Sequence, residues 1–161
     1  MSLLKTIAKW LDRLVVYTVI VLLVSMVVTT SAGVFWRYIL NSALSWSEEL
    51  GRFLLVWVSF LGAALATYRG AHIGINVIFD MLPPHVQLWL SRIVDFMIII
   101  FMGSILLNGV KILPIVHVRV APTLFIHMST PYLIMPVSAG IIIFQIFVRL
   151  LNSIDKRKAE Q

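Results

Sequence analysis

The sequence predicts an all-α integral membrane protein with four transmembrane helices and a short amphipathic interfacial helix between the second and third. Three observations lead to this class. Hydrophobic residues make up 60% of the 161 residues, the mean hydropathy is +0.99, and long uncharged runs follow one another along the chain. Only 12% of the residues are charged, whereas a soluble domain carries about 25%. The chain is expected to form one membrane domain over residues 1–161, with the phospholipid bilayer as its main solvent.

The first transmembrane helix is predicted over residues 14–38, preceded by a short amphipathic segment at the membrane surface over residues 1–13. Its uncharged run exceeds the roughly 20 residues that a span requires, and Arg37 and Tyr38 close it. Because this run is too long for the hydrophobic region of a signal peptide and no clean cleavage pattern follows, we expect it to be retained.

The second span is predicted over residues 46–68, with Arg69 after its end. Ser45 and Glu48 have the spacing of a capping box, which places Glu48 and Glu49 in the first helical turn, where the helix dipole favours anions. A patch of small residues suited to close helix packing lies in its second half: Gly62, Ala63, Ala64 and Ala66.

A short interfacial helix is predicted over residues 74–83, because apolar and polar residues there fall on different helical faces. The third span follows over residues 93–113 and is expected to end at Pro114. Asp95 lies near its start. Its pairing with Arg92, three residues earlier, is favoured, and a contact with another helix or a partner chain is the alternative.

The fourth span is predicted over residues 132–151, with Arg149 reaching the membrane interface at its exit. The loop before it, residues 115–131, is unusually apolar and contains Leu124 and Phe125. Apolar loops at a membrane face usually enter the interface or are covered by another protein. We therefore expect this loop to contribute to a docking surface.

A charged cluster precedes the core of the second span. Arg52 follows Glu48 by four residues and Glu49 by three, so it can pair with either carboxylate. The favoured interpretation is a solvated helix end at the lipid headgroups, where charges normally lie. The alternative is a polar cluster, with Arg37 and Trp46 nearby, that joins two membrane helices or this chain and a partner.

Four spans place both termini on one side of the membrane, and the distribution of basic residues predicts that this side is the cytoplasm. The inner segments would hold nine of the 13 Lys and Arg residues: Lys5, Lys9, Arg13, Arg69, Arg92, Arg149, Lys156, Arg157 and Lys158. The outer segments would hold Arg37, Arg52, Lys111 and Arg119.

Several classes of function are excluded by missing motifs. The sequence has no cysteine, no G-x-x-x-x-G-K-[ST] loop and no HExxH, and its basic residues form no stripe for nucleic acid. The centres of the spans lack charges and histidines, which a pore or proton pathway acting alone would need. We therefore expect no enzyme and no cofactor, but a scaffold or partner-binding membrane subunit.

Three motifs carry a family resemblance: Arg37-Tyr38-x-x-Asn41, Trp46-Ser47-Glu48-Glu49-Leu50-x-Arg52, and Gly62-Ala63-Ala64-x-Ala66-x-x-Arg69-x-x-His72-Ile73. Together with the four-span layout, they resemble the small, DctQ-type membrane subunit of tripartite ATP-independent periplasmic (TRAP) transporters. The resemblance implies a scaffold in the bacterial inner membrane that binds a large elevator-type membrane subunit. It also implies sodium-driven uptake of an organic acid, such as a C4-dicarboxylate or sialic acid, which a periplasmic binding protein delivers.

The alternative is a four-helix anchor subunit of a respiratory complex, in which helical histidines hold haem b. The histidines are His72, His85, His117 and His127, and all four fall in predicted connecting segments. The sequence therefore favours the transporter subunit.

Overall fold

The computed structural model describes residues 2–69 and 84–159. Within these residues, four helical segments are long and apolar enough to cross a membrane: Thr6–Ile39, Ser45–Tyr68, Trp89–His117 and Ser129–Leu150. This confirms the predicted all-α, four-span class. The predicted interfacial helix over residues 74–83 lies outside the described residues.

The first two helices form an antiparallel pair. Helix α1 (Ser2–Ile39) is continuous, so the predicted surface segment and first span belong to one helix. Helix α2 (Ser45–Tyr68) begins after Leu44, with no side-chain cap. The predicted capping box is therefore wrong, because the Glu48 carboxylate binds Arg37 of α1 instead. Near the helix start, the Ser47 hydroxyl donates a hydrogen bond to the Leu44 carbonyl, with 2.7 Å between the oxygens.

The second pair consists of helix α4 (Pro84–His117), the single turn α5 (Ser129–Tyr132) and helix α6 (Ile134–Ala159). Helix α4 extends beyond the predicted span in both directions and continues through Pro114, so the predicted helix end at this proline is wrong. A proline removes only one backbone hydrogen bond, and membrane helices tolerate this loss where neighbouring groups compensate. Pro114 cannot donate to the Val110 carbonyl, so α4 lacks one backbone hydrogen bond near its end, yet the helix continues for three more residues.

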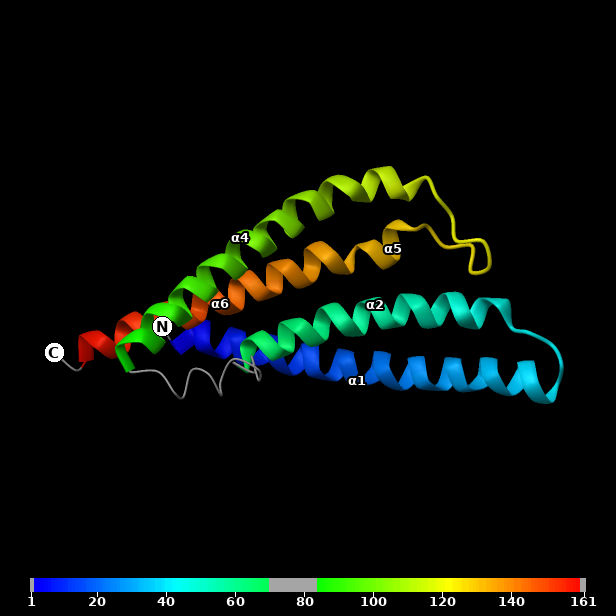
Figure 1. Cartoon of the computed structure of the whole chain (residues 1–161), viewed down its shortest axis with the longest axis horizontal. Coiled ribbons are helices and arrows are strands. Elements are labelled where there is room, and N and C mark those ends of the chain that lie inside the picture. The colour runs from blue at the N-terminus through cyan, green and yellow to red at the C-terminus, as the bar shows by residue number, and fades with distance from the viewer. Residues whose placement is uncertain (1, 70–83, 160–161) are drawn as a thin grey trace.

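The helices lie in the spatial order α1, α2, α6, α4 (Figure 1). Helices α2 and α6 pack together in the middle, α1 packs against α2, and α4 packs against α6. The two buried clusters, Val15–Leu61–Ile134 and Ala64–Ile142–Ile146, each join residues of α2 and α6. The central helices therefore provide most of the core.

The two ends of the bundle differ. The beginning of α1, the end of α2, the beginning of α4 and the end of α6 lie together, and we call this the terminal end (Figure 1). The opposite end holds the α1–α2 connection and the loop 118–128 that follows α4, and we call it the loop end.

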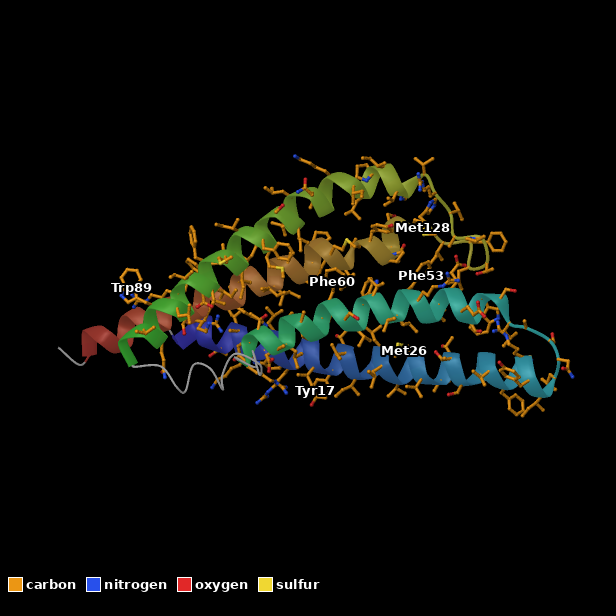
Figure 2. The ribbon with its side chains drawn as sticks, in the orientation of Figure 1. Tyr17, Met26, Phe53, Phe60, Trp89 and Met128 are labelled. Carbon is orange, nitrogen blue, oxygen red and sulfur yellow. The ribbon has the colours of Figure 1, made fainter. Side chains whose placement is uncertain are left out.

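Large apolar side chains cover the outer faces of the bundle. Tyr17 of α1 and Trp89 of α4 point outward on different sides, whereas Phe60 of α2 packs in the core between the helices (Figure 2). Exposed apolar residues continue along both outer helices, from Ile20 to Phe35 on α1 and from Phe96 to Ile115 on α4. These faces fit a lipid or protein environment, which agrees with the membrane class.

Candidate functional site at the loop end

An ion pair joins α1 to α2 at the loop end. The Arg37 guanidinium binds the Glu48 carboxylate, and both side chains are about half exposed, at 50% and 53%. Arg52 donates from Nε to the Glu48 backbone carbonyl over 3.3 Å, not to the carboxylate. The predicted Glu48–Arg52 ion pair is therefore wrong, because the carboxylate turns across the helix interface toward Arg37.

Glu49 fastens the loop 118–128 to the start of α2. Its side chain is buried, with the residue 7% exposed. One carboxylate oxygen accepts hydrogen bonds from the Thr123 and Leu124 backbone N–H groups at 3.0 and 3.1 Å, and from the Thr123 hydroxyl. The second predicted pair, Glu49–Arg52, does not form an ion pair, because the Glu49 carboxylate is directed toward the loop 118–128. A segment more than 70 residues away in sequence is thus held by one charged side chain.

The loop itself forms a tight reversal of the backbone. Val120 and His127 form an antiparallel bridge, and the Ala121 N–H donates to the Ile126 carbonyl over 2.9 Å. Phe125 has a positive backbone φ of 54°, which residues other than glycine rarely adopt. This conformation leaves the Phe125 residue 81% exposed, whereas Leu124 is half-buried. Of the two apolar residues predicted to dock a partner, only Phe125 is presented prominently at the surface.

Two histidines close the base of this loop. The rings of His117 and His127 stack with centroids 4.2 Å apart. His127 Nδ1 lies 2.9 Å from the His117 carbonyl oxygen, and His117 Nδ1 lies 3.0 Å from the Ser129 hydroxyl. Both rings therefore contact the loop and its flanking residues. The prediction that all four histidines fall in connecting segments is wrong for His85 and His117, which lie in the first and last turns of α4. His72 lies outside the described residues.

A groove of about 590 Å³ runs between α1 and α2 below the ion pair. Its floor is narrow because the helices approach closely at Gly33, where an added Cβ would lie 2.4 Å from the Ser47 hydroxyl oxygen. Charged and aromatic side chains line its mouth: Arg37, Tyr38, Glu48 and Arg52. The groove and the loop held by Glu49 both lie at the loop end, so most of the sequence-predicted site residues gather there.

The remaining predicted residues have separate positions. Trp46 and Tyr38 are exposed at the loop end, near the ion pair. Arg69 follows α2 at the terminal end, where its N–H donates to the Leu65 carbonyl over 3.2 Å. Arg69 therefore does not belong to the cluster of the other predicted residues.

A second polar site lies at the terminal end. The sequence indicates its residues but not the contact between them. Arg149 of α6 binds the Asp95 carboxylate of α4, and its Nη1 lies 3.4 Å from the Thr67 carbonyl of α2. The predicted Arg92–Asp95 pair is wrong, because Asp95 is buried toward α6 while Arg92 is exposed. Arg149 likewise binds inside the bundle and does not simply reach the interface. The available signal was an acid and a base at similar depths in two antiparallel spans.

The fold and these sites define a small multi-pass membrane protein whose polar contacts gather at its two ends. The family model for the DctQ component of tripartite ATP-independent periplasmic transporters matches residues 26–156. The chain therefore belongs to this family. It is a transporter component and not an enzyme.

Three relatives illustrate the match. A putative TRAP transporter small permease protein of Haemophilus influenzae is 33% identical over 96 residues, which is 60% of each chain. The isethionate TRAP transporter permease protein DctMQ of Oleidesulfovibrio alaskensis is 30% identical over 115 residues, 70% of this chain but only 18% of the relative. The sialic acid TRAP transporter small permease protein SiaQ of Vibrio cholerae is 33% identical over 73 residues, 45% of this chain and 42% of the relative. In each case the match spans less than two thirds of the relative's length.

Proposed function

We propose that this chain is the small scaffold subunit of a sodium-driven TRAP transporter and binds a large membrane subunit. The substrate is an organic acid of the C4-dicarboxylate or sialic acid class, and a periplasmic binding protein delivers it. The observation that carries the proposal is the match to the permease protein DctMQ. The stretch aligned with this chain makes up only 18% of that relative. Such a relative joins the counterpart of this chain to a much longer membrane permease.

The distribution of polar residues supports a scaffold role. In the described spans, charged side chains lie toward the two ends, where Arg37 pairs with Glu48 and Asp95 pairs with Arg149. A chain that carried a charged substrate alone would be expected to place ionisable groups near the membrane centre. The exposed apolar residues of α1 and α4 instead suit contact with lipid and with the partner subunit.

The test of this function is co-purification and uptake. We expect a tagged version of the chain to co-purify with a larger membrane chain in mild detergent. Uptake of the acid in cells is expected to require both chains, the binding protein and a sodium gradient. A stable monomer, together with uptake that persists after deletion of this chain, would contradict the proposal.

We also propose that both termini lie in the cytoplasm, so that the terminal end faces the cytoplasm and the loop end faces the periplasm. Its support is the excess of basic residues in the segments of the terminal end. A reporter that is active only in the periplasm should be silent when fused after Gln161. Activity at that position would reverse the orientation.

The loop end is the surface proposed to receive the periplasmic binding protein. Phe125 is its most exposed aromatic residue, and Glu49 holds the loop that presents it. Phe125→Asp should reduce uptake while the membrane complex still assembles, because the exposed ring makes little contribution to the fold. The control is Trp89→Asp, which changes another exposed aromatic residue, at the terminal end, and should leave binding-protein docking unchanged.

A further inference from the structure

A cavity of about 330 Å³ opens at the terminal end, between the beginning of α1 and the ends of α2 and α6. Lys9 of α1, Tyr68 of α2, and Gln145 and Arg149 of α6 are among the residues that line it. None of these lining residues lies at the loop end. The cavity therefore requires its own explanation.

Gln145 is the unusual residue of this cavity. The residue is 4% exposed, and neither its amide nitrogen nor its amide oxygen has a hydrogen-bond partner within the described part of the protein. Arg149 Nε is buried and unpartnered in the same way. A buried polar group without a partner costs free energy comparable to a lost hydrogen bond. Such groups around one cavity indicate a site for a polar ligand.

The available donors favour a phosphate oxygen. The Gln145 amide and Arg149 Nε supply neutral and charged N–H groups, and Lys9, exposed at the mouth, adds an ammonium group. Guanidinium and ammonium groups together form charge-assisted hydrogen bonds to phosphate. Two acids lie close by. Asp95 is bound to Arg149, and Asp12, one helical turn after Lys9, has one buried carboxylate oxygen without a described partner.

We propose that this cavity binds the phosphate of a phospholipid headgroup. Trp10, the residue after Lys9 on α1, is exposed at the same end of the helix. Tryptophan side chains are enriched at the headgroup level of membranes, which is the depth that a lipid phosphate occupies. With the orientation proposed above, on which this assignment of leaflet rests, the lipid belongs to the cytoplasmic leaflet. Basic pockets between membrane helices on that side are known binding sites for anionic headgroups.

The test measures lipid binding and not transport, so it is independent of the proposed function. The protein is purified in mild detergent with any membrane chain that accompanies it, stripped of lipid, and titrated with phosphatidylglycerol in native mass spectrometry. Gln145→Leu should weaken the tightest binding step at least tenfold, and Lys9→Gln should weaken it several-fold. Arg13→Gln removes the same charge from the same helix outside the cavity, and should bind as the wild type does.

The stability of the lipid-free protein separates a ligand site from a structural role. Gln145→Leu removes an unpartnered buried amide, so it should raise the unfolding temperature while it weakens lipid binding. Unchanged lipid affinity in both Gln145→Leu and Lys9→Gln would overturn the proposal. Competition by inorganic phosphate at millimolar concentration would also overturn it, because the ligand would then be a free phosphate and not a lipid.

Discussion

The two ends of the bundle each hold an ion pair between helices, but the pairs differ in burial and in sequence separation. At the loop end, Arg37 and Glu48 are 11 residues apart and both about half exposed. At the terminal end, Asp95 and Arg149 are 54 residues apart, and the Asp95 side chain is only 11% exposed. An exposed pair contributes little to stability, whereas breaking a buried pair leaves a charge without compensation. The terminal end therefore depends more strongly on its ion pair.

The largest effect is expected from Asp95→Asn. This variant keeps the side-chain shape but leaves Arg149 without its carboxylate. The free energy of unfolding should fall by up to about 3 kcal/mol, the lower part of the range for a broken buried pair, because Arg149 is partly exposed. Unfolding in a denaturing detergent measures it. The control is Arg92→Gln, and an equal loss in both variants would show that the buried pair has no special role.

The next effect concerns close packing at the loop end. In Gly33→Ala the new methyl group meets the Ser47 hydroxyl, which already binds the Leu44 carbonyl. We expect a loss of about 1–3 kcal/mol, as for other overpacked sites. Gly62→Ala is the matched control, since no atom lies within 4 Å of its added Cβ. If Gly33→Ala is as stable as Gly62→Ala, the helices do not rely on this contact.

A smaller and local effect is expected from Glu49→Ala, which removes the acceptor of three hydrogen bonds from the loop. Backbone amides of Thr123 and Leu124 should exchange hydrogen faster, while the amides of α2 should remain protected. Glu48→Ala should leave the exchange of the loop unchanged, because Glu48 binds α1. Equal exchange in the two variants would remove Glu49 from its role as the loop anchor.

The smallest effect is expected at the exposed ion pair. Arg37→Glu or Glu48→Arg alone should cost about 1 kcal/mol or less, and the double exchange should recover most of it. The exchange Glu49→Arg with Arg52→Glu should give no such recovery, because the partners of Glu49 are on the loop 118–128. If only the exchange of Glu49 and Arg52 recovered stability, these two residues would be the ion pair, and Arg37 and Glu48 would not. Thermal unfolding in detergent can compare the two double exchanges with their four single variants.

Hydropathy alone predicted the four spans, because lipid requires long apolar helices whatever their order of packing. The partners of the polar residues were harder to predict. Local spacing predicts that Asp95 pairs with Arg92, but the packing of α4 against α6 brings it to Arg149. The anchoring of the loop by Glu49 depends likewise on a contact across the bundle. Local rules describe one helix and cannot indicate which face meets another.

The sequence also gives no sign that Gln145 is unusual. A single amide near the end of an apolar run looks like an ordinary interfacial residue, and only its burial without partners distinguishes it.

The spatial order of the helices has a consequence for biosynthesis. Helix α6 follows α2 and α4 in the sequence, yet it lies between them, so both leave the ribosome before it. Until Arg149 has been translated, Asp95 is a lone acid in a newly inserted helix, and the Thr67 carbonyl also awaits its partner. A chain that ends before Arg149 therefore leaves an uncompensated acid in an inserted helix. Premature termination in α6 should direct it to membrane proteases.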